Sequence, residues 1–495
     1  MASIKDITSL CKAGKLIEGY TLAKQEYEKE PSNVWAQRGL GWALYYVIRE
    51  DVELRKKDDF FSHMNQLADL GELSVESDSM IFDSLFWKLA EFVKMEPKDN
   101  PYNVDKLFNI ISKYKFKPST SYSYFLKCVM GFESWYRLVD FFEWWNIDNL
   151  MPEDYNKFTM DNGKKIMSLA EQAYIAYAKA LLGRNDREKI AAFLPKIEHL
   201  TNTYPDMMYP GYYCGRLMLS MGCNREDALG SVLPFVRKKK TEFWVWKLLA
   251  DIHQGESDIQ LACLQRAVHC KTEEAFIGKV RIALAQECIK RNDYARAKFH
   301  IDKVTQCYMS NGWRLPGEIQ TWISEGWLKT IKNSDSTDAI DYKTITDRLL
   351  ADGANYSIAA ITYVDQQRKK VSIIYGEKKR ASVSMAVFPI KVYEGGLFKI
   401  SWIPTEKGIN IITAAKCGRD SIESLNYMMQ VKGKISKAEN QDFAFISSKD
   451  VRAFVGPSKV NSYNLKNGEE VSAVLVLDYN SKKEQWNWVC LSIKR

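Results

Sequence analysis

The chain has 495 residues, of which 46% are hydrophobic and 27% are charged. This composition excludes a disordered chain, and the length predicts two to four domains. The N-terminal stretch MASIKDITSLCKAGKLIEGY has no apolar core of signal-peptide length, and no run approaches the ~18 apolar residues of a membrane span. The ten cysteines form no CxxC pair, so we expect reduced thiols in a cytoplasmic protein.

The net charge of +8 is distributed unevenly along the chain. Residues 356–495 hold 22 Lys and Arg against 13 Asp and Glu, so they carry +9 and the first 355 residues carry −1. An excess of this kind favours a polyanionic partner for the C-terminal part. The alternative is a solubility bias that serves no partner.

Residues 1–350 are predicted to be helical throughout. Apolar residues recur every three or four positions, for example in RIALAQECIKRNDYARAKFHIDKVTQ. The helical pattern ends near LLADGANYS, where Gly353 is a candidate helix C-cap.

Two series of small residues recur about every 35 residues in the helical part. They are Ala180, Gly215, Ala250 and Ala285, and Ala192, Ala228, Ala262 and Ala297. Small residues at such points allow two antiparallel helices to approach closely. The pattern, seen in WVWKLLADIHQGESDIQLACLQRAV, resembles the tetratricopeptide repeat (TPR), whose period is about 34 residues. This resemblance implies a solenoid over residues 1–350 with a protein partner on its concave face, although the pattern is irregular between about residues 50 and 175.

Two stretches of the helical part have a structural and a functional interpretation. Trp144 and Trp145 either fill the layers between helices, which their helical spacing favours, or line a peptide groove. The basic run from Arg237 to Lys240 is either a solvated loop, which we favour, or a contact to phosphate.

From Tyr356 the pattern changes to short β-branched and aromatic runs separated by turns, such as YSIAAITYV, KVSIIYG and INIITAA. Aligned with itself, this region gives two copies of about five strands each, residues 356–425 and 430–495. Their size and strand count are those of OB-fold barrels. The predicted fold class is therefore multidomain α + β, with an all-α solenoid followed by two small β-barrels.

The second copy resembles the cold-shock domain and its S1-type OB-fold relatives. The resemblance is carried by Gly433, by DFAFI at 442–446, by AFVGP at 453–457 and by the later LKNGEEVSAVLVLD. It implies that Phe443, Phe445 and Phe454 stand on an exposed sheet face and stack bases. The interior would then be filled by Ile446, Val455, Val471 and Val474. The residues expected to meet phosphates are Lys432, Lys434, Lys437, Lys449, Arg452 and Lys459.

Several positions depart from the cold-shock pattern. Gln441 and Asp442 replace the Lys-Gly before the first phenylalanine, Ala444 replaces the glycine between the rings, and Gly456 replaces a histidine. The stacking surface would be smaller and would carry a carboxylate. Two interpretations therefore stay open, a module that binds single-stranded nucleic acid and an OB-fold kept as a protein-docking surface.

The last strand and the first copy give weaker signals. Trp486 and Trp488 are expected outside the barrel, against the neighbouring module or as extra stacking surface, with Val489, Leu491 and Ile493 in the core. In the first copy Tyr363, Tyr375 and Phe388 are the weaker counterparts of the three phenylalanines, and Trp402 is a candidate core residue.

No pattern indicates an enzyme, a cofactor or a metal site. The sequence has no phosphate-binding loop ending in GK[ST], no HExxH and no GxSxG. Cys263, His269 and Cys270 match no zinc spacing, and each of the five histidines lies on an ordinary predicted helix.

The whole arrangement, a solenoid followed by S1- or cold-shock-type modules, resembles accessory proteins of bacterial conflict (phage-defence) systems. We therefore expect a cytoplasmic, non-enzymatic adaptor that binds a protein partner and single-stranded RNA or DNA. The alternatives are a scaffold that binds only proteins and an enzyme of unrecognised type.

Overall fold

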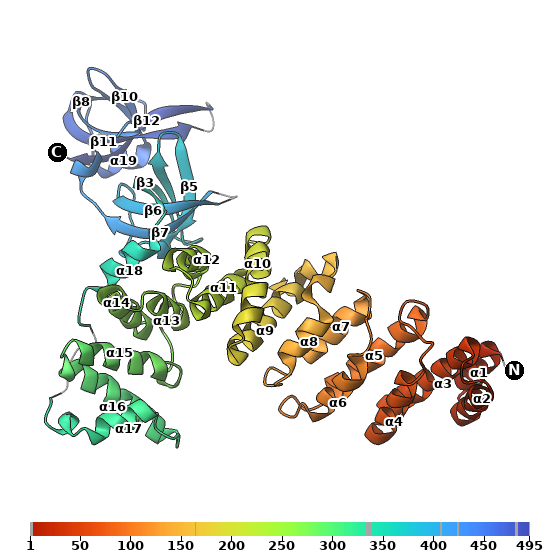
Figure 1. Cartoon of the computed structure of the whole chain (residues 1–495). Coiled ribbons are helices and arrows are strands. Elements are labelled where there is room, and N and C mark those ends of the chain that lie inside the picture. The colour runs from red at the N-terminus through yellow and green to blue at the C-terminus, as the bar shows by residue number, and fades with distance from the viewer. Residues whose placement is uncertain are drawn as a thin grey trace. The chain divides into compact units, whose positions relative to one another are not determined.

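The computed structural model describes residues 3–163, 165–332, 334, 338–405, 408–422, 425–480 and 484–494. The chain divides into two compact units, residues 1–235 and 236–495, with the boundary inside α12 (Arg225–Lys238). Helices make up the first unit, apart from one short hairpin, and the second unit combines helices with two β modules (Figure 1). Within the described ranges, no helix is long and apolar enough to cross a membrane.

Helices of the first unit pack against neighbours one or two positions along the chain, as α1 does on α2 and α5 on α7. They are α1 (Ile4–Lys12), α2 (Leu16–Lys29), α3 (Val34–Glu53), α4 (Lys57–Ala68), α5 (Ser79–Met95), α6 (Tyr102–Ile111), α7 (Thr120–Val129), α8 (Leu138–Trp145), α9 (Leu169–Arg184), α10 (Arg187–Thr203) and α11 (Met208–Met221). Helix α2 ends at Lys29, shortly before Pro31, and the Asn33 side chain caps α3. A hairpin of β1 (Phe158–Thr159) and β2 (Lys165–Ile166) precedes α9.

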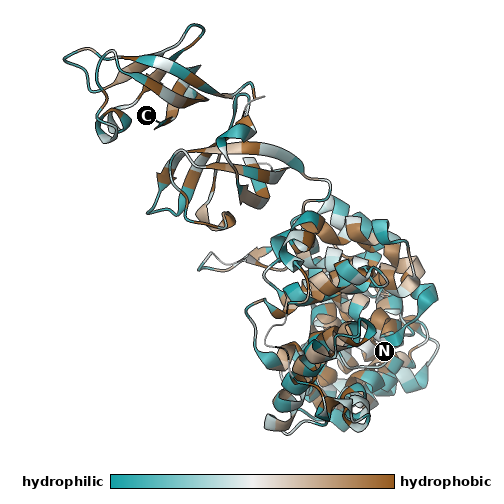
Figure 2. Cartoon of the chain, turned by 90° about the vertical axis from the view of Figure 1, so that its left-hand side faces the viewer, coloured by the Kyte–Doolittle hydropathy of each residue, from teal (hydrophilic) through white to brown (hydrophobic). Residues whose placement is uncertain are grey.

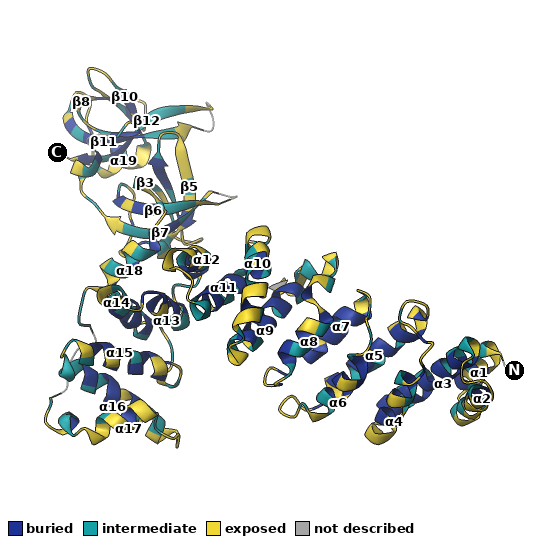
Figure 3. Ribbon diagram, viewed as in Figure 1, coloured by how far each residue is buried: buried dark blue, intermediate teal, exposed yellow. Residues whose placement is uncertain are grey.

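Aromatic side chains fill the layers between these helices. Trp145 is fully buried and stacks on Tyr122 with ring centroids 4.7 Å apart. Trp144 is half-buried, and its indole N–H donates to the Tyr114 carbonyl at 3.0 Å. Figure 3 shows the buried residues along α5 and α7. The preference for a structural role of these tryptophans is therefore confirmed.

The 35-residue period is visible in three helix pairs. They are α11 with α12, α13 (Phe243–Ile252) with α14 (Ser257–Val268), and α15 (Gly278–Lys290) with α16 (Tyr294–Ser310). The first helices of the pairs begin at Met208, Phe243 and Gly278, 35 residues apart.

The small residues of these three pairs lie at close helix contacts. Ala228, Ala250, Ala262, Ala285 and Ala297 are all buried. A Cβ added to Gly215 would lie 2.0 Å from Cγ2 of Val232. The expected series is wrong at its first member, since Ala192 is exposed and Ala180 is half-buried. These two side chains lie on α10 and α9, where the interhelical contacts use other residues, such as Phe193 and Ala178.

Two residues of the basic run bind backbone carbonyls, Arg237 one at the end of α18 and Lys240 one in β7, so the expectation of a solvated loop is wrong for them. Arg237 donates to the Leu350 carbonyl at 2.9 Å and to the Asp352 carbonyl. The Lys240 ammonium donates to the Ile412 carbonyl at 3.0 Å, and burial lowers the pKa of this ammonium group.

Helices α17 (Gly317–Ser324) and α18 (Tyr342–Leu350) complete the second unit's helical part, and α18 packs on α14 and β7. Helix α18 ends at Leu350 with Ala351 as its C-cap, and Gly353, the candidate C-cap, follows with a positive φ of 64°.

The first β module is a five-stranded sheet in the order β5-β4-β3-β6-β7. Its strands are β3 (Asn355–Asp365), β4 (Lys370–Gly376), β5 (Lys379–Ser384), β6 (Leu397–Thr405) and β7 (Gly408–Lys416). Hydrophobic and hydrophilic residues alternate along the strands of both β modules (Figure 2), as one buried face requires.

The second β module is a closed barrel in the order β10-β12-β11-β8-β9. Its elements are β8 (Met428–Ser436), β9 (Ala444–Ser447), β10 (Arg452–Val455), α19 (Pro457–Ser462), β11 (Glu470–Asn480) and β12 (Gln485–Lys494). Numbered within each module, both sheets have the neighbour order 3-2-1-4-5. In the second module, parallel pairing of Phe454 with Val489 closes the barrel. In the first module, no described pairing joins β5 to β7. The expected fold class, helices followed by two five-strand β modules of one topology, is confirmed.

A shared apolar cluster joins the two β modules. Ala360, Ile374 and Leu397 of the first module pack with Met428, Val474, Val476 and Leu491 of the second. Val474 and Leu491 therefore leave the barrel interior, and their expected core positions are wrong. Val471, Ala473 and Leu475 point into the barrel, so Val474 faces outward by the regular alternation of β11. On β12 the ladder is irregular, because Val474 pairs with Ser492 and Leu475 with Cys490, and this places Leu491 outside while Cys490 and Ile493 stay inside.

Candidate nucleic-acid interface

The site begins with the alternation of two short strands. On β9 and β10 the residues that point inward are Ala444, Ile446, Ala453 and Val455, all at most 1% exposed. Residues between them must point outward, because successive strand residues face opposite sides of a sheet. Phe445 and Phe443 are half-buried, and Phe454 is 37% exposed. The outward position predicted for the three phenylalanines is confirmed.

The three outward rings, Phe443, Phe445 and Phe454, form a cluster that we call the aromatic triad. Phe445 pairs directly with Phe454 across β9 and β10, and with Ser436 of β8. The ring centroids lie 5.7–6.0 Å apart, two of the pairs being edge-to-face. These contacts hold the three rings in one cluster on the outer face of the sheet, where Phe454 is the most exposed.

Arg452 lies beside the aromatic triad and packs on one of its rings. Its guanidinium carbon lies 4.2 Å from the centroid of the Phe445 ring. On β10 it occupies the outward position two residues before Phe454, opposite Ser447. A guanidinium so placed stacks on aromatic faces and can also donate to a phosphate.

The predicted lysines differ in how available their charge is. Lys432 and Lys434 are exposed on β8, and Lys449 is exposed in the turn between β9 and β10. Lys434 lies opposite Ser447, in the same outer row as Arg452. Its ammonium is 3.7 Å from the Glu470 carboxylate, but both side chains are mostly exposed, so this pair holds the lysine only weakly.

The two remaining cations are less open. Lys437 is half-buried after the end of β8, where its backbone N–H donates to the Asn467 side chain at 3.0 Å. Lys459 was expected within or beside the strands, but it lies on α19. There its ammonium is 4.0 Å from Glu394 of the first module, and its side chain is only 20% exposed.

Strands β8 and β9, next to the aromatic triad, approach each other closely at Gly433. A Cβ added to Gly433 of β8 would lie 2.7 Å from the Ser447 carbonyl oxygen and 2.8 Å from Cγ2 of Ile446. Only glycine allows this approach of β8 to β9.

The barrel core also includes a short helix that the sequence did not indicate. This helix is α19, whose Val460 fills the core together with Leu465 of the following turn. Burial in the same core raises the pKa of the Cys490 thiol to about 11, so the thiol stays protonated.

The tryptophans of β12 are not part of the triad. Trp488 packs against the barrel core, so its expected place outside the barrel is wrong. Trp486 pairs with Tyr479 across β11 and β12, with ring centroids 5.5 Å apart.

The first module has no equivalent of the aromatic triad among its expected counterparts. Tyr375 and Phe388 are buried in its core, and of the three only Tyr363 is exposed. Trp402 packs partly against that core, in line with its expected place, and its indole N–H donates to the Ser357 hydroxyl at 3.0 Å.

The histidines and cysteines of the helical part do not form a cluster. His269 lies 2.6 Å from the Asp338 carboxylate and stacks on Tyr342, whereas Cys263 is fully buried on α14. Within the part of the chain that the structure describes, no group of three potential metal-ligating side chains comes together.

Comparison with known families gives two matches. Residues 429–493 match the S1/CSD-like domain 2 of the TOTE conflict systems, and residues 208–347 match a domain of unknown function, DUF7017. The first match covers the closed barrel and confirms the expected resemblance to S1 and cold-shock domains and to proteins of conflict systems. The second covers the three helix pairs with the 35-residue period, and it does not bear on the TPR resemblance. A search of curated proteins gives no match.

Proposed function

We propose that the chain is a non-enzymatic adaptor that binds single-stranded RNA or DNA on the aromatic triad. The observation that carries the proposal is the combination of three clustered outward rings with Arg452 over Phe445. Every base has a π-face, and stacking on an aromatic ring contributes about 1–3 kcal/mol per base with little sequence preference. The match of residues 429–493 to an S1/CSD-like domain supports the same interpretation.

The exposed positive charges around the triad suit a nucleic-acid strand with several phosphates better than a single base. Lys432, Lys434 and Lys449 carry exposed ammonium groups on the strand and turn beside β9. Phosphates of a strand whose bases stack on the rings would be neutralised by these groups, which makes the affinity salt-dependent.

In the same proposal, the helical part binds a protein partner. The 35-residue helix pairs are similar to TPR hairpins, which bind partners along a concave face. Exposed aromatic side chains on the first unit support partner binding. Trp35 of α3 is 63% exposed beneath the Arg38 guanidinium, and Trp87 of α5 is 46% exposed beside Tyr124 of α7. Trp and Arg are enriched among the residues that dominate protein interfaces. In a bacterial anti-phage conflict system, the partner would supply the enzymatic activity.

The proposal is tested by the binding of labelled single strands of about 12 nucleotides, within the range that OB-folds occupy, to the full chain. Fluorescence anisotropy should show saturable binding that Phe443→Ala, Phe445→Ala and Phe454→Ala each weaken. The absorbance ratio at 260 and 280 nm before and after a high-salt wash should reveal nucleic acid carried through purification. If no strand binds and the ratio does not change, the module does not bind nucleic acid.

A second candidate function is a scaffold whose β modules dock protein. It is favoured by the pairing of Lys434 with Glu470 and of Lys459 with Glu394, which offsets part of the basic charge. The exposed carboxylate of Asp442 beside Phe443 favours it as well. The binding experiment separates the two, because a protein-docking module would leave single strands unbound.

A further inference from the structure

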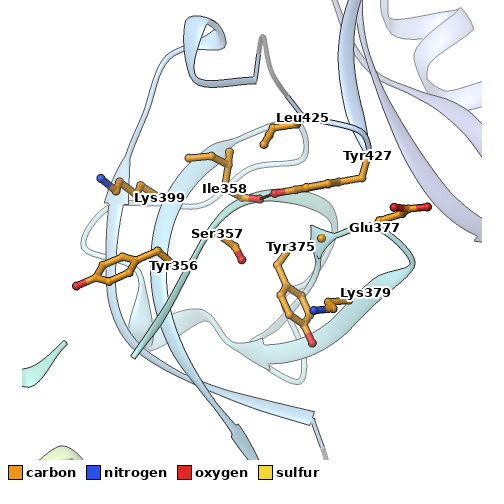
Figure 4. A pocket seen from close by; sticks show the side chains of 10 residues that line it. Tyr356, Ser357, Ile358, Tyr375, Glu377, Lys379, Lys399, Leu425 and Tyr427 are labelled. Atoms are coloured by element: carbon orange, nitrogen blue, oxygen red, sulfur yellow. Dashed lines mark hydrogen bonds between the residues drawn. The ribbon is translucent and has the colours of Figure 1, made fainter. Parts of the chain in front are cut away.

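A cleft of about 690 Å³ opens on the first β module where the linker to the second module ends. Its walls come from the start of β3, the β4–β5 hairpin, β6 and the linker residues Leu425 and Tyr427 (Figure 4). The volume lies within the range of about 300–1,000 Å³ that is usual for small-molecule sites. No local pattern in the sequence marks this cleft, because residues as far apart as Ile358 and Tyr427 build it.

The cleft exists because β4 is shorter than β3. Strand β4 begins to pair with β3 only at Ala360, so Asn355–Ala359 pair with β6 alone among the described strands. The opposite edge of this segment faces the cleft. Its Ile358 carbonyl accepts a hydrogen bond from the Tyr427 hydroxyl at 3.0 Å, which fixes the linker as the far wall.

Aromatic rings and ammonium groups line opposite sides of the cleft. Figure 4 shows Tyr356 and Lys399 on one side and Tyr375 and Lys379 on the other. Tyr356 is 59% exposed, so its ring is open to a ligand. Tyr375 packs edge-on against Trp402, with ring centroids 5.0 Å apart.

The polar groups favour an anionic ligand. Lys379 and Lys399 are both exposed, and the carboxylate of the neighbouring Glu377 already accepts from the Asn426 amide at 2.6 Å. The Ser357 hydroxyl accepts from Trp402 and keeps its own proton to donate. Burial raises the pKa of Tyr375, so its phenol also remains a donor.

We infer that this cleft is a second binding site, for a nucleoside phosphate. The base would lie against Tyr356, and the phosphate would pair with the Lys399 ammonium group on the same side, while Lys379 adds positive charge from the opposite side. An open aromatic ring with two cations matches a ligand that combines a planar ring and a negative charge. The nucleotide is either free or one unit of a strand, and only in the second case does the inference rest on the proposed function.

The test measures the binding of two probes to the full chain, adenosine monophosphate and a single strand of about 12 nucleotides. The cleft variants are Tyr356→Ala and Lys399→Ala, both at exposed side chains, so folding should be retained. The matched controls are Tyr363→Ala, a tyrosine of β3 that is 55% exposed outside the cleft, and Lys391→Ala, an exposed lysine outside the cleft. Phe445→Ala reports on the aromatic triad.

A free-nucleotide site predicts that adenosine monophosphate binds and that both cleft variants weaken it at least about fivefold. The controls and Phe445→Ala should then leave that affinity unchanged. A strand site predicts the same loss for the single strand, in addition to the loss that Phe445→Ala causes.

The inference is overturned if the cleft variants bind both probes like the parent chain, or if the parent chain binds neither probe. If Phe445→Ala alone loses affinity for the single strand, the proposed function is supported and the cleft is not a binding site. If the cleft variants lower the affinity for adenosine monophosphate while neither the parent chain nor any variant binds the single strand, the cleft is a binding site and the proposed function is wrong.

Discussion

Phe445 and Phe454 lie directly opposite each other on β9 and β10, with their ring centroids 6.0 Å apart. The next pair along the same ladder is Ile446 with Ala453, and both are fully buried. One strand register therefore fixes both the outer rings and the barrel core. A shift by one residue would bury the phenylalanines and expose Ile446, so the core holds the triad in place.

This relationship separates binding from stability in a small set of variants. Phe445→Ala should remove about 1–3 kcal/mol of single-strand affinity, because one stacking ring is lost. Its free energy of unfolding should fall less than that of Ile446→Ala, which leaves a cavity in the barrel at a cost of about 2–5 kcal/mol. Anisotropy titrations and urea unfolding curves on the same preparations measure both. A Phe445→Ala chain that unfolds as early as Ile446→Ala, or binds like the parent, would rule out the stacking role.

The charges beside the triad should appear in the salt dependence of binding. The logarithm of the affinity should fall linearly with the logarithm of salt concentration, by about 0.7 for each phosphate neutralised on a single strand. Lys432→Ala and Arg452→Ala should each reduce the slope by about one phosphate contact. Lys391→Ala, at an exposed lysine of the first module, is the matched control and should leave the slope unchanged. Equal slopes in all four proteins would show that neither residue contacts phosphate.

The sequence predicted the triad because its signal is local. Phe445 and Ile446 alternate within one short regular strand, and the ladder to β10 has no irregularity. The same reasoning failed on β12, where Val474 pairs with Ser492 and Leu475 with Cys490, so the alternation changes at Leu491. No residue type marks that position, so Leu491 was assigned to the wrong face.

Long-range contacts were also outside the reach of sequence reasoning. Arg237 lies 113 positions before Leu350, whose carbonyl it binds, and a basic run looks the same whether it is solvated or buried. The 35-residue period, in contrast, was predicted where whole helix pairs repeat, from Met208 onward. It failed at Ala192, because small residues are also common on exposed helix faces.

The helix contacts of the repeating pairs give a third prediction. Ala250→Leu and Ala285→Leu insert a larger side chain where both residues are at most 1% exposed. Overpacking of this kind should cost about 1–3 kcal/mol and lower the melting temperature. Ala192→Leu, at an exposed position on α10, two helix pairs before Ala250, is the matched control and should melt like the parent. Unchanged melting of both buried variants would mean that these helices do not approach closely at Ala250 and Ala285.

The last prediction concerns the effect of pH on the helical part of the second unit. His300 is fully buried, and burial, followed by the positive charge of Arg281, lowers its pKa from 6.5 to about 3. The Arg281 guanidinium donates to its Nδ1 at 3.2 Å, and Asp293 and Arg296 also act on the ring. The folded state therefore holds a neutral imidazole, whereas the unfolded chain takes up a proton below pH 6.5. Because the unfolded state binds more protons, stability should fall as the pH drops through that window, by on the order of 1 kcal/mol per pH unit.

Urea unfolding near pH 7.5 and near pH 5.5 measures this loss for the parent chain and for His300→Gln. The variant cannot take up the proton, so its loss of stability between the two pH values should be smaller by about 1 kcal/mol. His199→Gln, at an exposed histidine, is the matched control and should behave like the parent. Every other titrating group is common to the proteins compared, so the difference isolates the one ring. Equal losses in the parent and His300→Gln would show that His300 is able to protonate within the fold, and that its burial beside Arg281 does not exclude the proton.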